Sequence, residues 1–112
     1  TADWVREGIK VLHLGDYYSA NGQIEALIAE GETELSIGSH AGIRDSSELM
    51  AVYPKGVRVD AVAEEGGDYG EETGVIGDPT KASATRGEKL LTLKVRAALA
   101  QLRREVPAQD LY

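Results

Sequence analysis

The sequence of 112 residues contains no cysteine, and this absence excludes disulfide frameworks and thiolate metal sites. It also lacks any apolar run approaching the roughly 20 residues that a membrane-spanning helix needs. Its first residues, Thr1-Ala2-Asp3-Trp4, lack the charged and apolar regions of a signal peptide. We therefore expect one modest domain in the cytoplasm, with no membrane partner.

Basic residues are scarce, with 12 lysines and arginines against 19 acidic residues and a net charge of -7. This balance opposes binding to nucleic acid or to anionic membranes. Residues 81–112 are the exception, because they hold 7 basic and 3 acidic side chains. That local basic face fits either a solvated helix surface or a contact with an acidic partner.

Hydrophobic periodicity predicts strands that alternate with helices. Short β-rich runs at Lys10–Leu14 and Leu35–Ile37, and an alternating stretch at Val57–Ala61, suggest extended segments. Apolar residues at helical spacing predict helices at 21–30 and 47–53. The alternation indicates an α/β fold.

The last helix carries the strongest helical pattern in the chain. Thr85 and Glu88 have the spacing of a capping box, and apolar residues follow at intervals of three and four, namely Leu91, Val95, Ala98 and Leu102. The stretch before this helix, residues 64–78, has five glycines and six acidic residues and is predicted to be a loop. Its acidic part, residues 64–72, is either a solvated segment or a site that recruits cations, and Gly74–Pro79 is predicted to be a turn.

Without cysteine, candidates for catalysis are two histidines, the carboxylates and several hydroxyls. His40 is the most suggestive, because it lies in a glycine-flanked turn between a predicted strand and a helix, with Asp45 five residues on. An imidazole near a carboxylate can move protons around neutral pH. The alternative is a histidine that holds its loop together by hydrogen bonds.

His13 lies in an apolar run and is expected to be a packed histidine, or else a metal ligand. Asp16, Tyr17 and Tyr18 follow at the end of the predicted strand, where they could carry function or cover the core. A hard-metal site built from His13, Asp16, His40 and Asp45 is chemically feasible. The sequence shows no His-x-x-x-His or Glu-x-His spacing that would favour it.

Three stretches in order resemble the C-terminal half of the creatininase family, and together they cover roughly residues 9–104. They are Ser39-His-Ala-Gly-Ile-Arg-Asp-Ser-Ser-Glu-Leu-Met50, then Tyr53-Pro54 with Val57 and Arg58, then Thr73-Gly-Val-Ile-Gly-Asp-Pro-Thr80 followed by Ala82, Gly87 and Glu88. The resemblance implies a metal-dependent amidohydrolase with a three-layer α/β/α sandwich, a mostly parallel sheet and commonly a homohexameric assembly. It also implies two divalent ions, zinc or manganese, and a proton shuttle at His40.

The departures from the family pattern are as informative as the match. Family members are about twice as long, and their metal ligands belong to an N-terminal half that this sequence does not contain. The resemblance therefore implies that residues 1–112 form about half of the domain, contribute no metal ligand and need the N-terminal half as a separate chain or lost segment. Ser39 stands where the family often has glutamate, and Asp45-Ser46 replaces a glutamate-threonine pair, so creatinine is not the expected substrate.

Two hypotheses follow. In the first, the chain is part of an enzyme that hydrolyses a small, preferably cyclic, amide, with His40 and Asp45 as catalytic residues and Asp16, Tyr17, Tyr18 and Ser39 as substrate-binding residues. A variant of it makes Thr1 a nucleophile exposed by self-cleavage. In the second, the chain is a non-catalytic binding or assembly subunit that has kept the half-fold.

Overall fold

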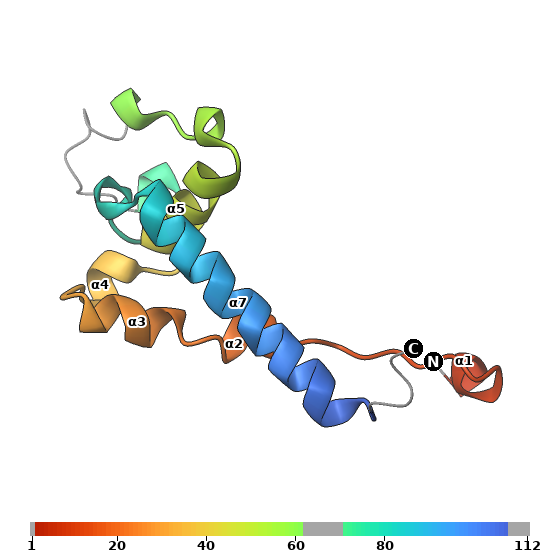
Figure 1. Cartoon of the computed structure of the whole chain (residues 1–112). Helices are drawn as coiled ribbons and strands as arrows, with labels where there is room; N and C mark the ends of the chain where they lie inside the picture. The colour runs from red at the N-terminus through yellow and green to blue at the C-terminus, as the bar shows by residue number, and fades with distance from the viewer. Residues whose placement is uncertain (1, 62–70, 108–112) are drawn as a thin grey trace.

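The computed structural model describes residues 2–61 and 71–107, and these residues are helices joined by loops (Figure 1). The helices are α1 Ala2–Arg6, α2 Asp16–Ser19, α3 Gln23–Ala29, α4 Glu34–Ile37, α5 Ile43–Val52 and α7 Ala84–Glu105, with the short 3-10 turns η1 Pro54–Gly56, η2 Glu71–Thr73 and η3 Pro79–Lys81. Residues 59–61 are also helical. No helix in the described part of the chain is long and apolar enough to cross a bilayer.

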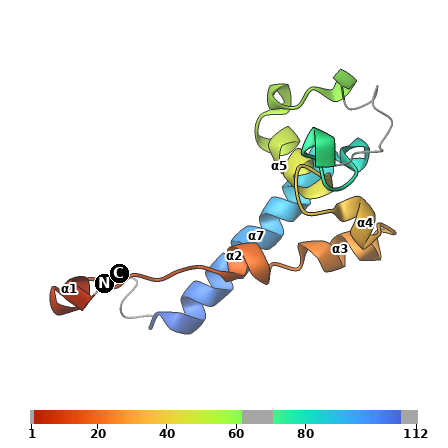
Figure 2. The ribbon, with the colours of Figure 1, turned by 180° about the vertical axis from the view of Figure 1, so that it is seen from behind.

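Helix α7 is the long central helix of the molecule, and α2, α3 and α5 pack along it (Figures 1 and 2). It begins after Ser83, whose Oγ accepts a hydrogen bond from the Arg86 N–H at 3.1 Å. The prediction of this helix is confirmed, but its cap is Ser83 and not Thr85. The buried face is also shifted, because Leu90 is 1% exposed whereas Val95 is 51% exposed.

The closest helix contact in the fold joins α5 to the first turn of α7. A Cβ added to Gly87 would lie 1.8 Å from the carbonyl oxygen of Ser47, so the two backbones approach more closely than any side chain allows. Ser47 is fully buried, and its Oγ accepts a hydrogen bond from the Ser83 N–H at 3.1 Å. The same serine therefore packs against α7 and satisfies a backbone donor beside its N-terminus.

The apolar core around this contact is small. Its buried members are Leu27 of α3, Ile37 of α4, Ile43 of α5 and Leu90 of α7, with Leu93 packed against them. Gln23 is buried among them, and its Nε2 donates to the Leu90 carbonyl at 2.9 Å and to Glu48 at 2.6 Å. Polar bridges thus supplement apolar packing between the helices.

The predicted α/β sandwich with a parallel sheet is wrong for the described residues, which contain no strand. Their β-type pairing is an isolated antiparallel bridge between His40 and Ile76. The apolar run Lys10–Leu14, expected to be a buried strand, is an extended segment without regular structure. A strand must be paired by a neighbour, and among the described residues this run forms no β-bridge.

The second predicted strand, Leu35–Ile37, belongs to helix α4. Thr33 and Ser36 form a reciprocal capping box, and the Ile37 N–H bonds to the Thr33 carbonyl at 2.9 Å. This local capping satisfies backbone donors that a strand would have left to a neighbour. The stretch predicted to be extended at Val57–Ala61 is likewise wrong in its second part, because residues 59–61 are helical.

The helices predicted at 21–30 and 47–53 are confirmed as α3 and α5, although α5 begins four residues earlier, at Ile43. Two other expectations fall outside the described residues. They are the role of Thr1 and the greater part of the acidic loop, residues 64–70.

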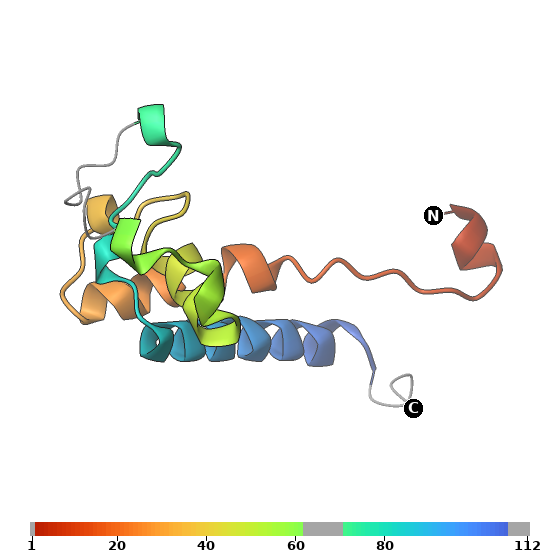
Figure 3. The ribbon, with the colours of Figure 1, turned by 90° about the horizontal axis from the view of Figure 1, so that it is seen from above.

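The N-terminal segment leaves the helical body as an arm. Residues 7–15 run away from the other helices and α1 stands at the far end (Figure 3). The radius of gyration is 17.6 Å, compared with about 13 Å for a compact chain of this length. The accessible surface is 7886 Å², compared with roughly 6,000 Å² for a compact 12 kDa protein. The chain therefore exposes surface that an ordinary single domain would bury.

We predict that Gly87→Ala destabilises the fold by about 2 kcal/mol or more, because the new methyl group would displace Ser47 and separate α5 from α7. Alanine is the better helix former, so helix propensity alone predicts the opposite sign. Denaturant unfolding followed by helical circular dichroism measures the change. Thr85→Ala, at an exposed site two residues earlier in the same helix, is the matched control and should stay within about 0.5 kcal/mol. Equal stability of Gly87→Ala and the wild type would contradict the close helix contact.

Candidate functional site

The loop between α4 and α5 carries His40 and is held in place by glycines. A Cβ on Gly38 would lie 1.8 Å from the Ile76 carbonyl oxygen, and one on Gly42 would lie 2.5 Å from the Ile37 carbonyl oxygen. Gly38 also has a φ of 65°, which favours glycine. Larger residues at either position would push the loop away from the segment around Ile76.

Backbone hydrogen bonds fix His40 against that segment. The Ile76 N–H donates to the His40 carbonyl at 2.8 Å, while the His40 N–H and the Ser39 N–H donate to the Ile76 carbonyl at 3.2 and 2.8 Å. The side chain of His40 is exposed, and no described residue hydrogen-bonds to its imidazole. The loop thus presents an exposed imidazole on a backbone that hydrogen bonds hold in place.

Asp45 holds the same loop from the first turn of α5. Its Oδ2 accepts a hydrogen bond from the Ala41 N–H at 2.9 Å, and the Ser46 Oγ donates to the Ala41 carbonyl at 3.2 Å. Ala41 has a φ of 53°, a left-handed conformation that costs energy in a non-glycine residue. The two side chains of α5 therefore offset the strain next to His40.

A pocket of about 480 Å³ lies beside this loop. The described residues of its wall come from the His40 loop, α5, the turn after it and the segment from η2 to η3. They are Ala41, Asp45, Ser46, Leu49, Gly56, Val57, Arg58, Ala61, Thr73, Val75 and Pro79. The volume lies within the range of small-molecule sites. The pocket was not predicted from the sequence. One signal for it is the Tyr53-Pro54 pair, which follows α5 and turns the chain so that Val57 and Arg58 face the same pocket as α5.

The other predicted site residues lie elsewhere. Asp16, Tyr17 and Tyr18 belong to α2, which packs on α7 and not on the His40 loop (Figure 1). Asp16 pairs with Arg104 at 2.9 Å, and Tyr18 is 73% exposed. Ser39 is in the His40 loop but does not line the pocket. The structure therefore brings Asp45 to the pocket and leaves the α2 residues along the central helix.

The described residues also do not assemble the metal site considered from the sequence. They contain no group of three or more histidine, aspartate or glutamate side chains that could hold an ion. His13 is exposed rather than packed, and its carbonyl accepts a hydrogen bond from Gln101 at 3.0 Å. The residues in hand thus do not fit a divalent metal without ligands from another segment.

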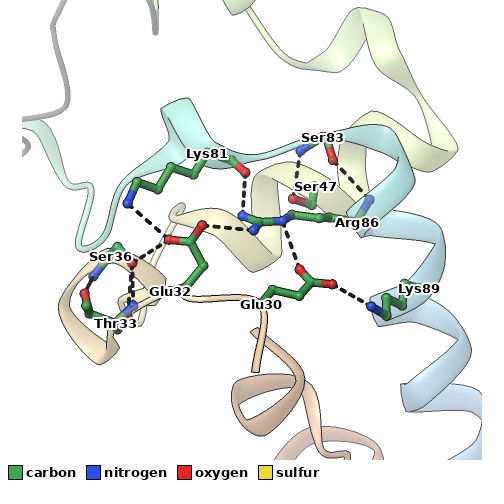
Figure 4. Close-up of polar contacts among 9 residues, drawn as sticks. All are labelled: Glu30, Glu32, Thr33, Ser36, Ser47, Lys81, Ser83, Arg86 and Lys89. Atoms are coloured by element: carbon green, nitrogen blue, oxygen red, sulfur yellow. Dashed lines mark hydrogen bonds and ion pairs between the residues drawn. The ribbon is translucent and has the colours of Figure 1, made fainter. Parts of the chain in front are cut away.

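An ion-pair network joins the α3–α4 connection to the start of α7 (Figure 4). Arg86 lies between two carboxylates, with its Nε 3.2 Å from Glu30 and its Nη2 2.9 Å from Glu32. Lys81 and Lys89 complete the network, at Glu32 and Glu30 respectively. This network ties η3 to α4, both of which border the segments that hold the His40 loop.

The network lowers the pKa of both glutamates. The hydrogen bond from Lys89 is the main cause at Glu30, where it outweighs burial. At Glu32 burial raises the pKa, but hydrogen bonds from Arg86, Lys81 and Ser36 together outweigh it. No local pattern in the sequence indicates this pairing, because its partners lie 49 to 59 residues apart.

Comparison with known proteins identifies the family of the chain. The family model described as creatininase, creatinine amidohydrolase, matches residues 9–102. The chain belongs to the creatininase family. Its match spans the His40 loop, the pocket and nearly all of α7, and the family-level activity is amide hydrolysis. Neither the curated proteins nor the solved structures gave a match to the chain.

We predict that the ion-pair network makes stability depend on pH. Both glutamate pKa values are lowered in the folded state, so their contribution is present above the ordinary value of 4.5 and is lost as the pH falls through the lowered values. Arg86→Gln should therefore flatten the loss of stability on acidification below about pH 5. Denaturant midpoints measured from pH 7 to pH 3 test this.

Arg96→Gln is the matched control for this series, because Arg96 lies on the exposed side of α7 and pairs with no described residue. It should keep the acid dependence of the wild type. If both variants show the wild-type slope, the network does not set the pH dependence.

Proposed function

We propose that this chain supplies the proton-shuttling part of a metal-dependent amidohydrolase that hydrolyses a small amide, preferably a cyclic one. The observation that carries the proposal is the family match over residues 9–102, together with an exposed imidazole held on a rigid loop at the matched motif. Asp45 and the close approaches of the glycines fix that loop, so the imidazole needs little reorganisation when a ligand arrives.

In this proposal His40 passes a proton to the amide nitrogen as the C–N bond breaks, so that nitrogen leaves as a neutral amine and the carbonyl carbon takes the oxygen of water. An imidazole is suited to this step because its ordinary pKa lies near neutral pH. Asp45 acts as a positioning residue through the Ala41 backbone. Ser39 and the α2 residues Asp16, Tyr17 and Tyr18 are proposed to meet substrate when the other half of the domain is in place.

We further propose that the divalent metal, zinc or manganese, takes its ligands from an N-terminal half carried by another segment or another chain, within a larger oligomer. The family pattern supports this division, because its metal ligands belong to the N-terminal half. The exposed apolar arm supports it too, because Val11 is 63% and Ile9 46% exposed. No step of the reaction is assigned to a metal held by this chain.

We predict that His40→Ala lowers kcat of the complete enzyme by about 10²-fold or more, with a smaller change in KM, because proton delivery is lost and binding is not. The measurement is steady-state hydrolysis of a panel of small cyclic and linear amides. His13→Ala is the matched control, since His13 is the other histidine of the chain and is also exposed. Equal activity of the wild type and His40→Ala would overturn the proposed role.

The second candidate function is a non-catalytic binding or assembly subunit that keeps the family's half-fold. The absence of the family's metal ligands from the sequence, together with Ser39 in place of the family's glutamate, favours it. Native mass spectrometry of the protein isolated from its host separates the two. A complex with a second polypeptide and divalent ions supports the hydrolase, and a metal-free assembly of this chain alone supports the subunit.

A further inference from the structure

The pocket beside the His40 loop carries one charged side chain of each sign on a largely apolar wall. Among the described residues that line it, Asp45 and Arg58 are the charged ones, and Leu49, Val57 and Val75 supply apolar surface. A few polar groups on an apolar wall are typical of sites that fix the orientation of a small ligand. A ligand that pairs with both Asp45 and Arg58 must offer a hydrogen-bond donor to the first and a negative charge to the second.

Asp45 has hydrogen-bonding capacity left over. Its Oδ2 is taken by the Ala41 N–H, while no described residue donates to Oδ1. A carboxylate has about four acceptor positions, so a ligand N–H can bond to Asp45 without releasing the loop. The acidic side of the pocket therefore suits an amide N–H or an amine.

Arg58 supplies the complementary side. Its position follows from the turn η1, which begins at Pro54 directly after α5. A Cβ added to Gly56 in this turn would lie 3.2 Å from the Leu49 side chain. Arg58 is exposed and forms no ion pair or hydrogen bond with a described residue. In contrast, Arg86 and Arg104 are both paired with carboxylates. The guanidinium fork of Arg58 has no partner among the described residues, and its geometry matches a carboxylate.

We propose that this pocket binds small amides, cyclic or linear, that carry a carboxylate, with Arg58 as the specificity-determining residue. Arg58 holds the carboxylate, Asp45 Oδ1 accepts from the amide N–H, and the apolar wall covers the acyl group. The identification of this ligand as substrate rests on the proposed hydrolase function. The ligand preference itself does not, because it is measured without hydrolysis.

The test is an NMR titration of the folded chain with a matched ligand pair, N-acetylglycine and the neutral N-acetylglycinamide. The two differ in charge and hardly in size, so their difference reports the carboxylate contact. We expect the acid to bind at least fivefold more tightly, with backbone shifts at Leu49, Val57 and Val75. Raising the salt concentration should reduce the difference, because the contact is partly exposed.

Three variants sharpen the test. Arg58→Gln should bring the two affinities within twofold of each other, and Arg58→Lys should keep part of the preference. Lys55→Gln is the matched control, because Lys55 is an exposed cation three residues away that does not line the pocket. It should keep the full preference.

Equal binding of acid and amide by the wild type would overturn the proposal, as would shifts confined to the basic residues of α7 or an unchanged preference in Arg58→Gln. The spectra of each variant show whether it is folded, and the comparison of ligands on the wild type tests the idea without any substitution. His40→Ala should keep the preference. Unchanged hydrolysis by His40→Ala in the complete enzyme would contradict the proposed function alone, whereas equal binding of acid and amide by the wild type would contradict the ligand preference alone.

Discussion

The described structure depends on the contact between α5 and α7 at Ser47 and Gly87. The absence of a side chain at Gly87 lets two helix backbones meet, and Ser47 turns that approach into a hydrogen bond with the backbone at Ser83. Ile43 and Leu90 become buried beside it. Since α5 also carries Asp45, the packing that gives the chain its core sets the position of the His40 loop.

Polar side chains join the helices around the small apolar core and supplement its packing. Gln23 bonds to the Leu90 carbonyl and to Glu48, which in turn pairs with Lys94 at 2.7 Å. These groups are mostly buried and are satisfied by one another, which is the condition under which buried polar groups do not destabilise a fold. They also specify which helix faces meet, because an unsatisfied carboxylate would be costly in any other register.

The site itself is built from backbone rather than from a cluster of reactive side chains. Glycines allow the His40 loop to touch the Ile76 segment, and Asp45 stabilises the left-handed Ala41. The result is one exposed imidazole on a loop whose next residue, Ala41, lines a pocket; the charged residues among its described lining are Asp45 and Arg58. Membership of the creatininase family gives this arrangement a chemical meaning that its geometry alone does not carry, since imidazoles on rigid loops occur in many proteins.

The sequence by itself determined the features that depend on near neighbours. The long helix α7 followed from its apolar spacing, the end of α5 from Pro54, and the family from the motif around His40, because each of these is encoded within a few residues. Tertiary structure decided the rest. Lys10–Leu14 has the composition of a strand, but a strand needs a partner that the described chain does not offer. Likewise, the helix face that becomes buried, the pairing of Arg86 with Glu32 and the meeting of Asp45 and Arg58 in one pocket depend on residues distant in sequence, which local patterns do not specify.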